Sequence, residues 1–336
     1  MQFSQRPARR ISFLASGLLV LLTAATMASL LYGPVPIGIE RTLASLAGHG
    51  DDIAEAIVVD LRLPRTILGL GVGAMLGAAG AALQGYLRNP LAEPSVLGAS
   101  NAAALGAVIA LYFGLAEWHP AALPLMAIAT GLGSLILLFA LAGRSESPLS
   151  LILGGIAVST LAGAAISLAL NLSPNPFAAM EIMTWLLGSL ENRSITHLWI
   201  ALPCVGIGLV LLFVDGRALD ALTLGDDSAR ALGNDLKRTR MRLMLGIAIG
   251  VGGAVAVSGA IGFVGLIVPH LIRPFTDRRP SSLILPSALG GAALLTLADV
   301  GVRIIPSTNE LKLGVVTAFL GVPVFFAQLI RERRVW

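Results

Sequence analysis

The stretch LMLGIAIGVGGAVAVSGAIGFVGLIVPHLI, residues 243–272, runs for 30 residues without an acidic side chain, a lysine or an arginine. As a single α-helix it would be about 45 Å long, whereas the hydrocarbon layer of a membrane is about 30 Å thick. Gly259 and Gly262 can break the helix, so the stretch predicts two shorter helices joined by an unwound segment. Because lipid cannot hydrogen-bond free backbone groups, that segment should be shielded by protein or border a wet cavity.

The rest of the chain is similarly apolar. Of the 336 residues, 56% are hydrophobic and 12% are charged, which lies far outside the composition of soluble domains. Eight further apolar runs, most of them long enough for one helical crossing, lie at about 11–32, 64–87, 95–115, 121–142, 149–171, 195–214, 281–301 and 313–330. We therefore expect an all-α polytopic membrane protein with a single transmembrane domain over residues 1–336.

The positions of lysine and arginine predict ten crossings, because short cytoplasmic loops carry an excess of these residues. If the run 243–272 is split, both termini are cytoplasmic and 17 of the 23 basic residues face inward. These are Arg6, Arg9, Arg10, Arg88, Arg144, Arg217, Arg230, Lys237, Arg238, Arg240, Arg242, Arg273, Arg278, Arg279, Arg331, Arg333 and Arg334. The six that face outward are Arg41, Arg62, Arg65, Arg193, Arg303 and Lys312.

Small residues recur every fourth position in three of the runs, at 69–85, 155–167 and 246–262. Apolar burial cannot drive helices together in lipid, so membrane helices associate through ridges of small residues that let backbones approach closely. We expect these ridges to pack against neighbouring helices.

Several classes of function are excluded or disfavoured. No glycine-rich phosphate loop ending in Gly-Lys-Ser/Thr occurs, so the chain cannot hydrolyse ATP by itself. Acidic residues lie in loops or near the ends of runs, and Asp299 has Arg303 four residues on as an ion-pair partner. The histidines lack metal-ligand spacing, and the single cysteine, Cys204, excludes an internal disulfide. We expect no catalytic, cofactor or metal site and no nucleic-acid partner. A secondary carrier or channel driven by an ion gradient is the alternative to an externally powered transporter.

A polar patch, DALTLGDDSARALGNDL at residues 220–236, interrupts this apolar chain within the largest inward loop, about 215–240. The pattern predicts a short helix, a break at Gly225, and a second helix with Asp226 as N-cap that ends at Gly233. A narrow apolar edge runs along the second helix, formed by Ala229, Leu232 and Leu236. From composition alone, this edge fits equally well against the protein's own inner surface or against a partner.

Six ordered blocks resemble the FecCD-type permease subunits of bacterial ABC importers for ferric siderophores, haem and cobalamin. The blocks are RLPRTILGLGVGAMLGAAGAALQGYLRNPLAEPSVLGAS from Arg62, WLLGSL from Trp185, LTLGDDSARALG from Leu222, GAIGFVGLIVPHLIR from Gly259, LADVGVR from Leu297 and GVVTAFLGVPVFF from Gly314. The resemblance implies ten helices in a bacterial cytoplasmic (inner) membrane and a homodimer around a central path. It also implies two separate ATP-binding cassette subunits, a periplasmic substrate-binding protein and a metal-chelate substrate.

The resemblance also implies roles for particular residues. The loop near 215–240 would dock on the ATPase through Leu222, Gly225, Asp226, Ala229, Arg230, Leu232 and Gly233. On the outer face, glutamates of the binding protein would meet Arg62, Arg65 and Arg303. At the inner end of the path, the gate would involve Asn89 and Leu91. Independently of the resemblance, Gln84 is polar within an apolar run one turn earlier, so we expect it to face water in the path.

Two further features bear on the family pattern. Lys312 stands in ELKLG, from Glu310, where many relatives have proline, and this adds an outward charge near Arg303. The segment 169–185 resembles the family's outer gate, while its prolines and asparagines by themselves predict irregular structure. The identity of the chelate stays open among haem, a ferric siderophore and cobalamin.

Overall fold

The computed structural model describes residues 5–119, 121–142, 148–305 and 310–333, and every regular element in those ranges is a helix. In chain order they are α1 (Gln5–Leu31), α2 (Ile39–Leu46), α3 (Asp52–Glu55), the π-helix η1 (Ala56–Arg62), α4 (Leu63–Leu87), η2 (Pro94–Leu97), α5 (Ala99–Tyr112), α6 (Leu115–Trp118), α7 (Ala122–Ala142), α8 (Pro148–Asn171), α9 (Pro176–Leu186), α10 (Ile195–Val214), α11 (Gly216–Leu222), α12 (Asp226–Ala231), α13 (Leu236–Ser258), α14 (Val264–Ile272), η3 (Arg273–Phe275), α15 (Pro280–Ile304) and α16 (Leu313–Arg333). The predicted all-α class is confirmed for these residues. Arg144 and Arg334, two of the arginines expected to face inward, lie outside them.

Seven described helices are long and apolar enough to cross a membrane, and three shorter apolar helices lie at Ala99–Tyr112, Val264–Phe275 and Leu313–Ala327. The long run 243–272 is broken as predicted, because α13 ends at Ser258 and α14 begins at Val264. Each of the nine apolar runs therefore contains at least one of these ten helices.

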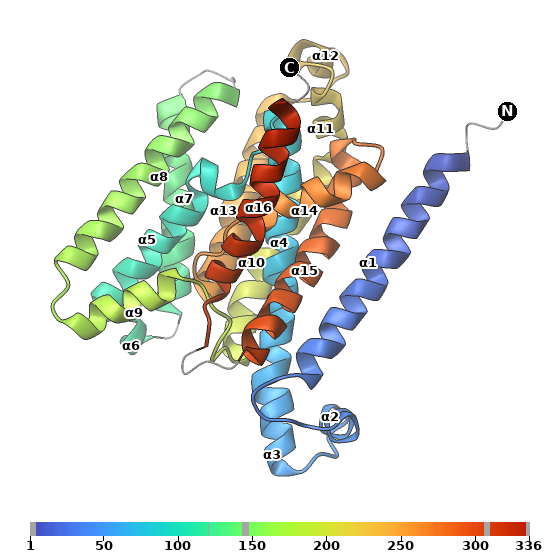
Figure 1. Cartoon of the computed structure of the whole chain (residues 1–336). Coiled ribbons are helices and arrows are strands. Elements are labelled where there is room, and N and C mark those ends of the chain that lie inside the picture. Colours follow the sequence, from blue (N-terminus) through green and yellow to red (C-terminus); the bar gives the residue numbers. More distant parts are fainter. Residues whose placement is uncertain (1–4, 120, 143–147, 306–309, 334–336) are drawn as a thin grey trace.

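The centre of the bundle is the pair α4 and α15, which cross in the middle of Figure 1 with α10, α13 and α14 packed around α4. Their backbones touch through glycine. A Cβ atom on Gly73 would lie 2.3 Å from the carbonyl oxygen of Gly291, and one on Gly77 would lie 2.1 Å from that of Ser287. The expected ridge on α4 is therefore a close helix contact.

The other two expected ridges behave differently. On α13, Gly246 and Gly250 approach Gly208 of α10, which places those two backbones side by side. On α8, a Cβ atom at Gly163 would meet nothing within 4 Å. The α8 ridge is thus not packed at Gly163 within the described part of this chain.

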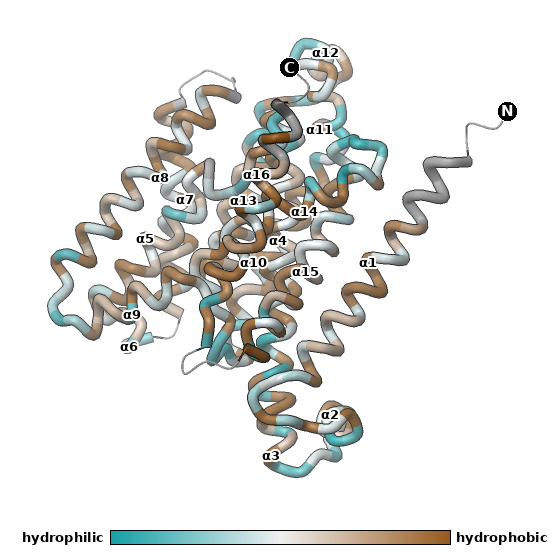
Figure 2. Tube along the Cα trace, in the orientation of Figure 1, coloured by the Kyte–Doolittle hydropathy of each residue, from teal (hydrophilic) through white to brown (hydrophobic). Residues whose placement is uncertain are grey.

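Hydrophilic residues gather at the two ends of the bundle, as the teal segments in Figure 2 show. One end carries α11, α12 and the turn before α15, and α1 starts and α16 ends on that side (Figure 1). The other end carries α2, α3 and the start of α4. We call these the elbow end and the arginine end, after the features described below.

Candidate functional site

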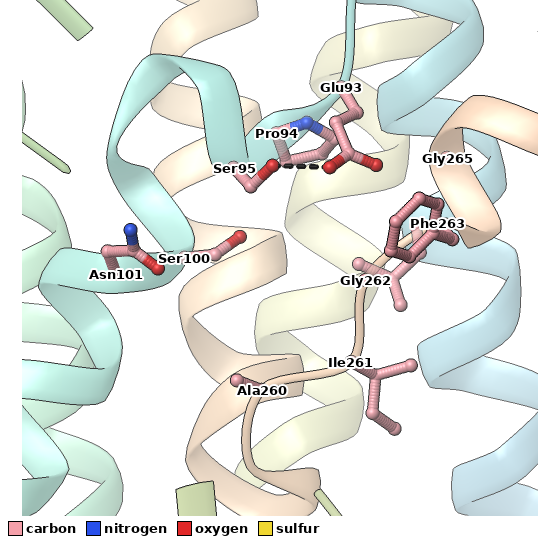
Figure 3. A pocket seen from close by; sticks show the side chains of 11 residues that line it. Glu93, Pro94, Ser95, Ser100, Asn101, Ala260, Ile261, Gly262, Phe263 and Gly265 are labelled. Carbon is pink, nitrogen blue, oxygen red and sulfur yellow. Dashed lines mark hydrogen bonds between the residues drawn. The ribbon is translucent and has the colours of Figure 1, made fainter. Parts of the chain in front are cut away.

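A cavity of about 130 Å³, lined by both polar and apolar residues, lies beside the break between α13 and α14 (Figure 3). One wall is the unwound segment 260–263, and the other carries the side chains of Glu93, Ser95, Ser100 and Asn101. The end of α13 is buried, and the carbonyl of its last residue, Ser258, accepts the backbone N–H of Ser189 at 2.8 Å. This agrees with the expectation that the broken segment is shielded by protein or borders a cavity.

Phe263, the N-cap residue of α14, has a backbone conformation that is unusual for an aromatic residue. Its φ is +68°, in the left-handed region. The ring packs directly on α16, because a Cβ atom at Gly321 would lie 2.5 Å from the Cβ of Phe263. Backbone strain of this kind persists only where the surroundings hold it and is concentrated at functional sites.

The loop after α4 leads from the elbow end to this cavity. Arg88 ends α4 with a left-handed backbone, and Asn89 then forms a tight turn in which its Oδ1 accepts the N–H of Leu91 at 2.9 Å. Both expected gate residues, Asn89 and Leu91, are half-buried. Pro94, in the same loop, packs against Gly265 of α14.

The expectation that Gln84 faces water in the path is wrong for this structure. Gln84 is only 3% exposed, and its Nε2 donates to the carbonyl of Gly265 at 3.3 Å. Its Oε1 accepts from Nη2 of Arg273 at 2.6 Å. Because the amide is engaged on both sides, Gln84 ties α4 to α14 and η3.

The helix-break-helix prediction for residues 220–236 is confirmed. We call residues 216–233, comprising α11 (Gly216–Leu222), the turn at Gly225 and α12 (Asp226–Ala231), the elbow. Gly225 has a φ of +99° and is itself the N-cap of α12, so Asp226 is the first helical residue rather than the cap. Gly233 follows α12 with a φ of +83°.

The elbow residues expected to contact an ATPase divide into two groups. Leu222 and Ala229 are buried, at 3% and 0% exposure, so the expectation that they touch a partner directly is wrong for this structure. They face the protein's own core because α11 packs on α4 and α15, and α12 packs on α13. The exposed members are Arg230, Leu232 and Gly233, while Gly225 and Asp226 are half-buried.

Sequence reasoning did not identify Leu224, which is 66% exposed on the elbow, as Leu232 is at 64%. Two apolar side chains on a polar loop are a recognisable signal. However, only the packing of α11 and α12 shows which of the elbow's apolar side chains point outward, the candidates being Leu222, Leu224, Ala229 and Leu232.

At the arginine end, Arg62, Arg65 and Arg303 line one cavity, and none of the three is on an exposed rim, because even the Arg65 side chain is only 12% exposed. Arg62 is 4% exposed, and its Nη1 donates to the carbonyls of Leu30 and Leu31 at 2.8 and 2.9 Å. Arg303 is 8% exposed, and its Nη2 donates to Ser29 Oγ at 2.7 Å. Both guanidinium groups therefore brace the end of α1 against α4 and α15.

Asp299 links the two helices of the central pair. It accepts from Nη2 of Arg65 on α4 at 2.8 Å and forms an ion pair with Nη2 of Arg303 on its own helix at 3.1 Å. The expected pair between Asp299 and Arg303 is confirmed. Arg65 also bonds to Glu310, which precedes α16, so one guanidinium joins α4, α15 and the start of α16.

A second cavity of about 290 Å³ opens beside these residues. Its lining includes four arginines and two glutamates, namely Arg62, Arg65, Arg193, Arg303, Glu191 and Glu310, so its net charge is positive. Nε of Arg193 is buried without a hydrogen-bond partner among the described residues. Burial lowers the pKa of the Arg193 guanidinium, and the negative charge of Glu191 opposes that shift.

Lys312, the residue that departs from the family pattern, has a partner in this structure. Its Nζ donates to Oε2 of Glu191 at 2.8 Å. The pair holds the start of α16 to the loop between α9 and α10.

Comparison with known proteins gives matches over nearly the whole chain. The model of the FecCD transport family matches residues 21–331. The chain is 38% identical over 319 residues to the vitamin B12 import system permease protein BtuC of Vibrio vulnificus, covering 94% of each. It is 40% identical over 314 residues to the Fe(3+) dicitrate transport system permease protein FecD of Escherichia coli, covering 93% of this chain and 96% of that protein. A solved metal-chelate type ABC transporter in an inward-facing conformation matches with a TM-score of 0.85 and 30% identity, over 95% of this chain and 99% of that one.

Proposed function

This chain belongs to the FecCD transport family, and on that premise we propose that it is the membrane-spanning permease subunit of an ATP-driven importer for metal chelates. The observation that carries the proposal is the elbow. It presents Leu224 and Leu232 to the outside at one polar end of an apolar bundle. Exposed apolar side chains on a structured loop are typical of a docking surface for another protein.

The energy for transport would come from other subunits. This chain has no phosphate-binding loop of its own. Two separate ATP-binding cassette subunits would dock on the elbows of a homodimer and rock the bundles as rigid bodies when they close on nucleotide. Within the elbow, we assign direct contact to Leu232, Arg230 and Gly233, and we add Leu224.

For orientation, we propose ten crossings with both termini and the elbow in the cytoplasm of a bacterial cell, and a single transmembrane domain in its inner membrane. The ten crossings would be α1, α4, α5, α7, α8, α10, α13, α14, α15 and α16. The arginine end then faces outward, toward a periplasmic binding protein.

We propose that the positive cavity at the arginine end receives acidic side chains of that binding protein. In this arrangement Arg65 lies nearest to the surface of the three predicted arginines, while Arg62 and Arg303 hold the outer ends of the helices in place. Charge pairs at such a rim should control the rate of docking and its sensitivity to salt more than the final affinity.

For the substrate, we propose a metal chelate such as vitamin B12 or ferric dicitrate. These are the substrates in the names of two related permeases. The path beside the broken helix would be gated at its inner end by Asn89 and Leu91. Gln84 would fix the position of α14 next to that gate.

Reconstitution tests the proposed function. The permease with its ATPase subunits is placed in lipid vesicles, and uptake of vitamin B12, ferric dicitrate and haem is measured with the loaded binding protein. We expect uptake of at least one chelate only when both ATP and the binding protein are present. Uptake driven by a sodium or proton gradient in the absence of ATP would instead establish the secondary carrier.

A further inference from the structure

Two carboxylates on the elbow bind the inner ends of the central helix pair. Asp220, on α11, accepts the backbone N–H of Ser281 at 2.8 Å and the hydroxyl of Ser281 at 2.5 Å. Asp226, the first residue of α12, accepts from Nη2 of Arg88 at 2.8 Å. Ser281 lies in the first turn of α15, and Arg88 ends α4.

The contact at Asp220 supplies a cap that α15 lacks locally. The N-cap residue of α15, Arg279, makes no side-chain cap hydrogen bond, and Pro280 follows it. The first backbone N–H groups of a helix have no partner within the helix, so a carboxylate from another element can cap them. The two backbones are also close, because a Cβ atom at Gly216 would lie 3.2 Å from the Cβ of Ser281.

The contact at Asp226 reaches the proposed gate. Arg88 has a left-handed backbone, and Asn89 and Leu91 form the turn that follows it directly. Any displacement of α12 that keeps the ion pair intact therefore pulls on the residue that precedes this turn. The side chains of the pair are about one-third exposed, at 39% for Arg88 and 32% for Asp226. An ion pair this exposed contributes little to the free energy of unfolding, so its role here is to fix the position of Arg88 relative to α12.

The two helices held by these contacts are also packed directly against each other. Gly73 and Gly77 of α4 touch the backbone of α15, and Arg65 joins the far ends of both helices through Asp299. An ordered pair of this kind transmits a displacement along its length, because packed interfaces shift as units.

We propose that Asp220 and Asp226 are positioning residues that fasten the elbow to α15 and α4, so that ATPase movement reaches the gate and the arginine end. This inference rests on the proposed function. It assigns Asp226 to a contact within the chain, whereas exposed Leu224 and Leu232 meet the ATPase.

The test measures ATP hydrolysis and chelate uptake in the same vesicles, with the complete importer. We expect Asp220→Ala and Asp226→Ala each to lower the uptake per ATP hydrolysed roughly five- to tenfold, at the low end of the range for coupling between sites. The ATPase subunits should still co-purify in wild-type amounts. Glu117→Ala is the control for loss of a carboxylate, because Glu117 is exposed on α6 and belongs neither to the elbow nor to α4 or α15.

Two further variants separate linkage from misfolding or from lost ATPase contact. The charge swap Arg88→Asp with Asp226→Arg should restore coupling that each single change removes. Asp220→Asn should have a smaller effect than Asp220→Ala, because its amide oxygen can still accept the N–H of Ser281. Failure of the swap to restore coupling, or loss of ATPase co-purification in the single variants, would overturn the proposal.

The wild-type importer distinguishes this inference from the proposed function. If the wild type shows no ATP-dependent uptake, the proposed function itself fails. If the wild type transports and both alanine variants keep wild-type uptake per ATP, only the linkage is wrong.

Discussion

The buried side chain of Asp299 should contribute strongly to the stability of the permease. It lies 2% exposed between Arg65 and Arg303, and its removal would leave Arg303 with uncharged partners alone. Breaking a buried charge network by removing one partner is costly, so we expect Asp299→Ala to destabilise the permease by about 3 kcal/mol. Thermal unfolding in detergent measures this. Asp227→Ala, which changes a fully exposed carboxylate, should leave the unfolding temperature nearly unchanged, and an equal shift in both variants would contradict the assignment.

Leu232 and Leu222 carry the same side chain but lie in opposite environments. Leu232 is 64% exposed and Leu222 is 3% exposed. We expect Leu232→Asp to reduce co-purification of the ATPase and ATP-dependent uptake while the permease unfolds at its normal temperature. Leu222→Asp should instead lower the unfolding temperature, because it buries an unpaired charge. The opposite pattern would mean that α11, and not α12, contacts the ATPase.

The sequence could place these residues in the right loop but could not orient them. The breaks at Gly225 and Gly233 follow from the local backbone preference of glycine, which can be read from the sequence alone. Whether Leu222, Leu224, Ala229 or Leu232 faces outward depends on how α11 rests on α4 and α15. The same limit explains Arg62 and Arg303, whose carbonyl partners at the end of α1 come from a distant part of the sequence.

At the level of elements, the glycine ridges give a direct prediction. A methyl group on Gly77 would collide with the carbonyl of Ser287 on α15, whereas one on Gly163 of α8 would meet nothing within 4 Å. Gly77→Ala should therefore destabilise the bundle by about 1–3 kcal/mol through overpacking, whereas Gly163→Ala should be neutral in the isolated permease or slightly stabilising. Denaturation of both variants in detergent tests this, and equal stability would argue against the close contact between α4 and α15.

Two elements differ from their sequence expectations for identifiable reasons. Residues 169–185 were expected to be irregular, yet Pro176–Leu186 forms α9, with Asn175 as its N-cap and Pro176 in the first turn. Asparagine followed by proline is a helix start as well as a breaker, so the signal was present but ambiguous. The apolar run from 64 continues backward through the π-helix Ala56–Arg62, a rare form that no apolar periodicity of 3.6 residues would identify.

At the scale of the whole molecule, apolar length and the distribution of arginine were enough to predict the main helices and the break between α13 and α14. These signals come from the membrane itself, which imposes length and charge rules on every crossing. The polar networks at the two ends follow no such rule. They depend on contacts such as Arg88 with Asp226 and Arg65 with Glu310, which join residues more than 100 positions apart.

Orientation is the property of the whole molecule on which both proposed partner surfaces depend. The side chain of Ile53, on α3, is 70% exposed at the arginine end, and Ser228 is exposed on α12 at the elbow end. In a Cys204→Ser background, we expect a membrane-impermeant maleimide to label the Ile53→Cys variant in intact spheroplasts. The Ser228→Cys variant should react only in inverted vesicles or after permeabilisation. Because the two sites lie at opposite ends of one bundle, labelling of both from the same side would break the ten-crossing arrangement. The reverse pattern would place the elbow away from cytoplasmic ATP and remove the basis for ATPase docking.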